Sequence, residues 1–168
     1  PNASAWTQSY GYDAAKRLTS IASPAGSFGY TYDPARNLQT GLLTLPNGAY
    51  ITNTYDNAAR LLSTVLKASD QSTINSHSYQ LNQANQRVQQ TFTAGNYVDY
   101  AYDNMGQLQT ARGTELGGAT SRLHEQIAYT YDAAGNLNFR TNNGLVEIFG
   151  VNSLNELTAA SNGGSPRL

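Results

Sequence analysis

Short segments in which apolar and polar residues alternate recur along the whole chain. In Tyr129-Thr130-Tyr131 the two aromatic rings lie two positions apart, which places both on one face of a β-strand, and tyrosine favours strands. A cluster of turn-forming residues follows each such segment, and no ten-residue window has the spacing of an amphipathic helix. The pattern predicts an all-β chain of short strands joined by tight turns.

The alternating segments share one template: an aromatic residue, any residue, Tyr, Asp, three variable residues, a polar residue and Leu. Five copies follow it closely, from Tyr10, Tyr30, Asn53, Tyr100 and Tyr129, and two weaker copies begin at Tyr79 and Phe149. Successive Asp or Asn positions lie 20 to 29 residues apart, which leaves room for two strands and two turns in each repeat. These repeat centres are Asp13, Asp33, Asp56, Asn82, Asp103, Asp132 and Asn152. Residues 1–168 are therefore interpreted as a single repeat array.

The residues after the Tyr pair predict a specific hairpin. Asp132 and Gly135 occupy the first and fourth positions of a type I turn followed by a left-handed residue in a G1 bulge. The outgoing strand then begins five residues beyond the Asp or Asn, at Leu18, Leu38, Leu61, Leu108, Leu137 or Leu157. Lys16, Arg36 and Ala59 occupy the position that favours Gly or Asn, so we expect about 1 kcal/mol of strain at each. The motif residues are Tyr10, Tyr12, Asp13, Tyr30, Tyr32, Asp33, Tyr55, Asp56, Tyr79, Asn82, Tyr100, Tyr102, Asp103, Tyr129, Tyr131, Asp132 and Asn152.

A second set of turn signals falls between the Tyr-Asp turns, as a chain that reverses after every strand requires. Five of these return turns are predicted to be short, at 24–26, 46–48, 94–96, 142–144 and 162–164. The other two fall within 67–75 and 113–121, where the extra residues are expected to enlarge the loops. The resulting prediction is an antiparallel meander of about fourteen strands in a curved or spiralling single-layer sheet.

The amino-acid composition argues against several classes of function. Only 12% of the residues are charged and the formal net charge is -1, so the chain lacks the basic stripe that phosphate neutralisation requires, and nucleic acid is not an expected partner. Cysteine is absent, which excludes disulfides and thiolate metal sites. No apolar run reaches the length of about 20 residues that a membrane span needs. The chain does not begin with Met or carry a signal peptide, so we interpret it as a piece of a longer protein.

No pattern of residues predicts catalysis. Five of the seven aspartates are turn residues of the template, whereas Asp70, Asp99 and the glutamates have no motif spacing. His77 and His124 lie far apart, in or beside the expected long return loops, without a metalloprotease or nucleophile-elbow context. We expect no catalytic residue, no metal site and no cofactor.

The template resembles the YD or RHS repeat of bacterial RHS proteins, of the C component of insecticidal Tc toxin complexes, of wall-associated bacterial proteins and of animal teneurins. That resemblance covers essentially the whole chain and implies hairpins joined into a strip of sheet that spirals into a hollow shell. In the toxin members the shell encloses a C-terminal cargo. The family's terminal DPxGL-type segment is absent, since the Asp33-Pro34 pair belongs to an ordinary repeat.

The resemblance implies a non-catalytic segment of a secreted or cell-surface shell wall, with neighbouring repeats and the cargo as partners. The alternative is an extracellular module that binds carbohydrate or a cell-surface protein through exposed tyrosine ladders. Its candidate contacts are Tyr30, Tyr32, Tyr100, Tyr102, Tyr129 and Tyr131. Because one sheet layer cannot bury its apolar face and leaves two edge strands unpaired, we also expect the fragment to associate with itself.

Overall fold

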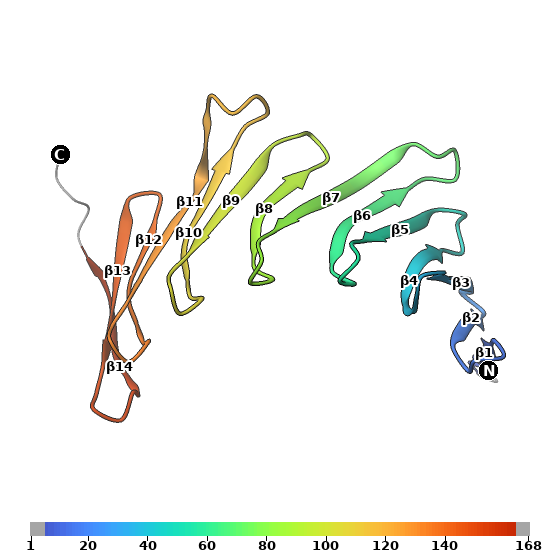
Figure 1. Cartoon of the computed structure of the whole chain (residues 1–168), viewed down its shortest axis with the longest axis horizontal. Coiled ribbons are helices and arrows are strands. Elements are labelled where there is room, and N and C mark those ends of the chain that lie inside the picture. Colours follow the sequence, from blue (N-terminus) through green and yellow to red (C-terminus); the bar gives the residue numbers. More distant parts are fainter. Residues whose placement is uncertain (1–5, 164–168) are drawn as a thin grey trace, which may run out of the picture. The chain divides into compact units, whose positions relative to one another are not determined.

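The predicted all-β architecture is confirmed by a computed structural model, which describes residues 6–163 except the side chains of Asn37 and Leu38. Fourteen antiparallel strands form one open sheet whose strand order follows the sequence from β1 to β14, and no helix occurs in 6–163 (Figure 1). The strands are β1 Ser9–Tyr12, β2 Leu18–Ser23, β3 Gly26–Asp33, β4 Arg36–Thr44, β5 Tyr50–Tyr55, β6 Leu61–Lys67, β7 Thr73–Leu81, β8 Arg87–Phe92, β9 Tyr97–Tyr102, β10 Leu108–Thr114, β11 Ser121–Tyr131, β12 Leu137–Asn142, β13 Leu145–Val151 and β14 Leu157–Gly163.

The chain divides into two compact units, Pro1–Tyr79 and Gln80–Leu168. The first contains β1 to β6 and most of β7, and the second contains the end of β7 and β8 to β14. Within each unit, successive strands pair as simple up-and-down hairpins. The prediction that 1–168 forms a single array is not tested by this division.

The Tyr-Asp hairpins close as the template predicts. In the Asp132 hairpin the Gly135 N–H donates to the Asp132 carbonyl at 3.0 Å, and the Asp132 N–H donates to the Asn136 carbonyl at 2.9 Å. Gly135 has φ +85°, which completes a type I turn with a G1 bulge. Lys16 and Ala59 adopt the same left-handed backbone, at φ 63° and 65°, so the strain expected at these two positions is present.

The Asp33 hairpin is an exception, and the prediction that its outgoing strand begins at Leu38 is wrong. Strand β4 already begins at Arg36, which pairs directly with Asp33 across a two-residue turn. Arg36 is not among the described residues with positive φ, so this hairpin does not hold it left-handed. Register shifts between Thr31 and Asp33 absorb the extra residues in β4. The other five predicted starts, Leu18, Leu61, Leu108, Leu137 and Leu157, are confirmed.

Four of the short return turns are confirmed. The 142–144 turn has left-handed residues at Asn143 and Gly144, with φ 52° and 84°, as a two-residue hairpin requires. Gly26, Gly48 and Gly95 likewise have positive φ in the turns at 24–26, 46–48 and 94–96. The fifth prediction, at 162–164, is wrong for Asn162 and Gly163, which belong to β14 and pair with Glu147 and Val146; residue 164 lies outside the described residues.

The prediction of long loops at 67–75 and 113–121 is wrong as well. The first connection is a five-residue turn, Ala68 to Ser72, in which the Gln71 N–H donates to the Ala68 carbonyl at 3.0 Å and Gln71 has φ 71°. Asp70 accepts hydrogen bonds from Ser72 and stabilises this turn. The second connection spans only 115–120, and most of its surplus lies in the eleven-residue β11. The additional residues of β11 form an irregularity within the strand, because residues 122–125 lie opposite Gly113 alone, between the Thr114–Ser121 and Arg112–Gln126 pairs.

The sheet has almost no enclosed interior. Among the described residues the only buried apolar side chains are Ala49 and Val98, and no large side chain is fully buried. Most strand residues instead have intermediate exposure. This is the burial expected of a single layer, so the repeats must be held together by lateral contacts between neighbouring strands.

Candidate functional site

The carboxylate of the motif stabilises its own turn. In the Asp56 hairpin, Oδ1 accepts hydrogen bonds from the backbone N–H groups of Ala58 and Arg60, at 2.9 and 3.0 Å, while Arg60 Nε donates to Oδ2 at 2.6 Å. The bond from the Arg60 backbone N–H is the largest cause that lowers the pKa of Asp56. The corresponding bond from Arg17 does the same for the pKa of Asp13. These aspartates therefore remain ionised as turn caps.

In several repeats the side chain four positions beyond the Asp or Asn forms a hydrogen bond with the side chain of that Asp or Asn. Arg60 pairs with an aspartate, and the Asn136 amide donates to Asp132 Oδ2 at 3.0 Å. Where the centre is Asn152, the order reverses, because its amide donates to the carboxylate of Glu156 at 2.7 Å. A donor at one position is thus matched by an acceptor at the other, which explains why the template has a polar residue here.

The second tyrosine of the motif joins one repeat to the preceding one. The Tyr131 hydroxyl donates to the carbonyl of Leu108 at 2.9 Å, and Leu108 is the first residue of the outgoing strand in the preceding repeat. Tyr32 makes the equivalent bond to Leu18 at 2.8 Å. Tyr102 makes it to Arg87 at 2.8 Å. The hydroxyl of a half-buried ring thus satisfies a backbone acceptor at each of these joints.

The Tyr55 joint shows how the motif adapts to the irregular Asp33 hairpin. Its hydroxyl donates to the Thr40 carbonyl at 3.0 Å rather than to Leu38, the residue expected at the start of that strand. The Asn53 amide, which replaces the first aromatic residue of the template, donates to the same carbonyl at 3.0 Å. Two side chains therefore donate hydrogen bonds to one backbone carbonyl where the register is shifted.

A second hydrogen bond between neighbouring repeats joins their turns, and we call this bond and the tyrosine bond the two ties of a joint. The Gln107 amide donates to the carbonyl of Gly135, the left-handed residue of the next repeat, at 3.0 Å. Gln86 makes the equivalent contact to Gly106 at 3.4 Å. At the Asn136 position the bond reaches the side chain of Asn155 at 2.9 Å. The joints made by Tyr131 and Tyr102 therefore each combine a tyrosine bond with a turn bond.

Partial burial disfavours ionisation of two joint tyrosines, Tyr102 and Tyr131. Desolvation is the largest cause that raises the pKa of both Tyr102 and Tyr131 above the ordinary phenol value. Both hydroxyls remain protonated at neutral pH and act as hydrogen-bond donors.

The tyrosines considered for carbohydrate contact occupy these joints. Tyr30, Tyr32, Tyr100, Tyr102, Tyr129 and Tyr131 all have intermediate exposure, and the second ring of each pair uses its hydroxyl on the backbone. Carbohydrate binding through these residues stays a prediction. It is tested by a glycan array with the Tyr100→Ala variant, whose folding is checked by circular dichroism.

The two histidines lie in strands rather than in loops, which corrects the expectation for their position. His77 belongs to β7 and pairs with Thr64 in the register. His124 has φ 70° in an irregular part of β11, where Arg122 forms ion pairs with Glu115 and Glu125. In the described part of the chain, no three His, Cys, Asp or Glu side chains gather as a metal site would require. Nor does that part contain a helix long and apolar enough to cross a membrane.

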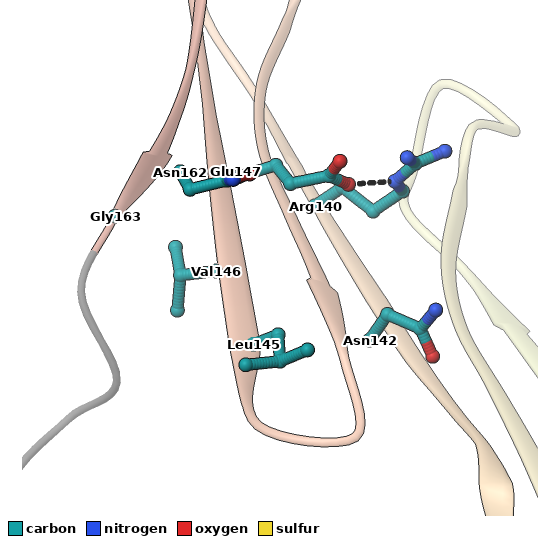
Figure 2. A pocket seen from close by; sticks show the side chains of 7 residues that line it. All are labelled: Arg140, Asn142, Leu145, Val146, Glu147, Asn162 and Gly163. Carbon is teal, nitrogen blue, oxygen red and sulfur yellow. Dashed lines mark hydrogen bonds and ion pairs between the residues drawn. The ribbon is translucent and has the colours of Figure 1, made fainter.

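An open hollow of about 350 Å³ lies along β12, β13 and β14 in the second unit. Figure 2 shows the Arg140 guanidinium and the Glu147 carboxylate joined by an ion pair, with Leu145 and Asn142 nearby. This ion pair lowers the pKa of Glu147 and raises that of Arg140. Because the two charges satisfy each other, the hollow offers no unpaired charge from this pair to a ligand.

Sequence reasoning found the residues of the joint but missed their partners. The carbonyls of Leu108 and Gly135 belong to the backbone, so no residue type marks them in the sequence. One signal was available: every repeat has a polar residue, Gln, Asn, Arg or Glu, next to its turn.

Comparison with protein families gives a match to the RHS Repeat over residues 12–50. The match confirms, for this part of the chain, the resemblance drawn from the template. A comparison with curated proteins gives no match.

Solved structures show the same fold. The chain is similar to the crystal structure of TcdB2-TccC3-Cdc42, with a TM-score of 0.75 and 15% identity over 89% of this chain and 9% of the other. It is also similar to the Photorhabdus luminescens Tc holotoxin pore carrying a TccC3 mutation, with a TM-score of 0.64 and 16% identity over 91% of this chain and 10% of the other. The chain thus spans about a tenth of the length of the structures it matches.

Proposed function

We propose that this chain is a non-catalytic wall segment of a secreted or cell-surface RHS-type shell that encloses a C-terminal toxin or other cargo. The observation that carries the proposal is the combination of a single sheet layer with regular lateral ties. A catalytic or binding domain of this size normally buries a core, whereas here no large side chain is fully buried in 6–163. Such a layer is suited to enclosing space.

The ties explain how a wall can exist without a core. Each joint that contains both ties combines the strand pairing with a tyrosine contact such as Tyr131 to Leu108 and a turn contact such as Gln107 to Gly135. Because the contacts connect nearest neighbours only, repeats can be added without changing those already present. Similarity to the fold of the Tc structures also supports the proposal of a wall segment.

The proposal is tested on the parent protein that contains this segment. Limited proteolysis of the native full-length protein should leave its C-terminal portion intact, because the wall keeps protease out. A low concentration of denaturant that loosens the sheet should make the same portion susceptible. Equal cleavage of the C-terminal portion before and after loosening would contradict enclosure, as would a gene that ends at the last repeat.

Two variants test whether the joints between repeats, rather than any single side chain, keep protease out. Tyr131→Ala removes a joint, whereas Leu123→Ala changes a side chain that is 82% exposed. The first variant should admit protease and the second should not. If both admit protease equally, the joints do not hold the wall closed.

A further inference from the structure

The connection between β10 and β11 is a weakly paired stretch in the middle of the second unit. From 116 to 125, only Ser121 has a partner in the ladder with β10, the residue Thr114. On the other side, the ladder between β11 and β12 begins at Ile127 (Figure 1). The repeats on both sides of this stretch belong to the described chain, so the missing pairs do not arise at an end of the array.

The same stretch is exposed and irregular. Leu123 and Leu116 are 82% and 72% exposed. His124 has φ 70°, a left-handed conformation that strains a residue with a side chain. A protease binds several residues of its substrate in extended form, so it must first pull a paired strand out of its ladder. Exposed, unpaired stretches open at a lower cost and are therefore preferred places for cleavage.

An arginine lies within this stretch, and acidic side chains hold it. The Arg122 guanidinium forms ion pairs with Glu115 at 3.1 Å and with Glu125 at 2.8 Å. The Arg122 carbonyl accepts a hydrogen bond from the Gln126 amide at 3.1 Å. Ion pairs between partly exposed side chains stabilise a conformation only weakly. Arg122 is therefore restrained at rest and becomes free when the stretch opens briefly.

We propose that the peptide bond between Arg122 and Leu123 is a processing site for an endoprotease that cuts after arginine, and that the Glu115 and Glu125 carboxylates slow the cut by holding the arginine side chain. The protease adds one water molecule across the bond. The Arg122 carbonyl carbon gains the hydroxyl group and becomes a carboxylate, and the Leu123 nitrogen gains a proton and becomes a new amino terminus. The proposal is independent of whether the parent protein encloses a cargo.

Basic residues in regular pairing are better protected. Arg112 pairs with Asp99 of β9 on one side and with Gln126 of β11 on the other. Lys16 lies in a closed turn, in which its N–H donates to the Asp13 carbonyl at 3.0 Å. Neither residue can enter a protease in extended form unless its ladder or turn is first broken.

The cut leaves both new ends in the sheet. Strands β10 and β11 stay paired from Thr110–Ala128 to Arg112–Gln126. The Tyr131 and Gln107 ties of this joint also lie away from the cut bond. Once the covalent connection is lost, these contacts alone hold the two parts together, because separation is no longer limited by the loop. The processed chain should therefore stay assembled in native buffer and come apart at a lower urea concentration than the intact chain.

Limited digestion of the native parent protein with trypsin tests the proposal. Within 6–163, the first cut should fall after Arg122, and N-terminal sequencing should find a new terminus at Leu123. Arg122→Gln should abolish this cut, whereas Arg122→Lys, which trypsin also accepts, should retain it. The matched control is Arg112→Gln, which removes another arginine of the same unit and should leave the cut unchanged.

A second pair of variants tests the role of the glutamates. Glu125→Gln removes one of the two carboxylates that hold Arg122, so cleavage should be about threefold faster. The control is Glu147→Gln, which releases Arg140 from its ion pair. Because Arg140 also has ladder partners on both sides, in β11 and in β13, no cut should appear after it at the same trypsin concentration.

Three results would overturn the proposal: an earlier cut elsewhere within 6–163, resistance of Arg122 until the whole protein unfolds, or an unchanged rate in Glu125→Gln. Circular dichroism checks that each variant folds. Cleavage in the C-terminal portion of the parent protein yields different fragments, so a failure of enclosure is read separately from a failure of this proposal.

Discussion

The first repeat and the Asp132 repeat have the same motif but differ in what surrounds it. Both aspartates cap their turns and both have lowered pKa values. Tyr131, however, is half-buried and bonded to the preceding repeat, whereas Tyr12 is 60% exposed at the edge. The motif therefore has two parts: a turn that forms locally and a joint that exists only when a neighbouring repeat is present.

The largest expected effect comes from removing the joint ring. Tyr131→Ala should lower the free energy of unfolding by about 2 kcal/mol because it exposes apolar surface and leaves the Leu108 carbonyl without its side-chain donor. Tyr12→Ala in dilute protein should cost less than about 0.5 kcal/mol because its ring is already largely exposed. Urea unfolding of both variants measures the difference. Equal losses would show that the joint adds nothing to the turn.

A smaller change isolates the hydroxyl. Tyr131→Phe keeps the ring and removes the donor, so we expect a loss of about 1 kcal/mol. Tyr12→Phe should leave stability in dilute solution unchanged, because the Tyr12 ring is 60% exposed. A double-mutant cycle is not available for a backbone acceptor, so the comparison of these two variants is the direct measure of the tie.

The turn part of the motif can be improved where its backbone is strained. Ala59→Gly should raise stability by about 0.5 to 1 kcal/mol, because Ala59 has φ 65° and the steric strain that glycine avoids there exceeds glycine's larger loss of conformational entropy on folding. Arg36→Gly should not be stabilising, since the Asp33 hairpin closes as a two-residue turn with Arg36 in strand β4. Chemical denaturation compares the two. A gain in Arg36→Gly would mean that this hairpin adopts the common turn in solution.

The smallest and most uniform effect should be the response to acid. The pKa values of Asp13, Asp56 and Asp132 are lowered by hydrogen bonds made in the folded state. Their contribution to stability is therefore present above the unfolded carboxyl pKa of about 4 and is lost as the pH falls through the lower folded values.

Because these bonds are local to each turn, Asp13 at the edge should respond like Asp132 inside the array. Carboxyl chemical shifts in an NMR titration measure each residue separately. An ordinary pKa at Asp13 alone would mean that the turn, too, needs a neighbour.

The sequence contained most of the local information. Alternating tyrosines, Asp at the first turn position and Gly or Asn at the fourth specify hairpins from contacts within five residues, so strand number, turn type and most strand starts could be predicted. The prediction failed where local signals conflict. At Asp33 the hairpin closes across two residues although Pro34 favours the longer type I turn, and at Asp70 an unrecognised cap formed a tight turn in place of a loop.

The amino-acid sequence alone specifies a β meander of repeated hairpins, because each hairpin is encoded by residues that are neighbours in the chain. Which groups accept hydrogen bonds from the tyrosines and the polar turn residues depends on the tertiary structure. Their acceptors, such as the carbonyls of Leu108 and Gly135, are backbone atoms that every residue possesses and that strand register alone brings within reach. Contacts of that kind depend on how one repeat is placed against the next, and residue identity does not record it.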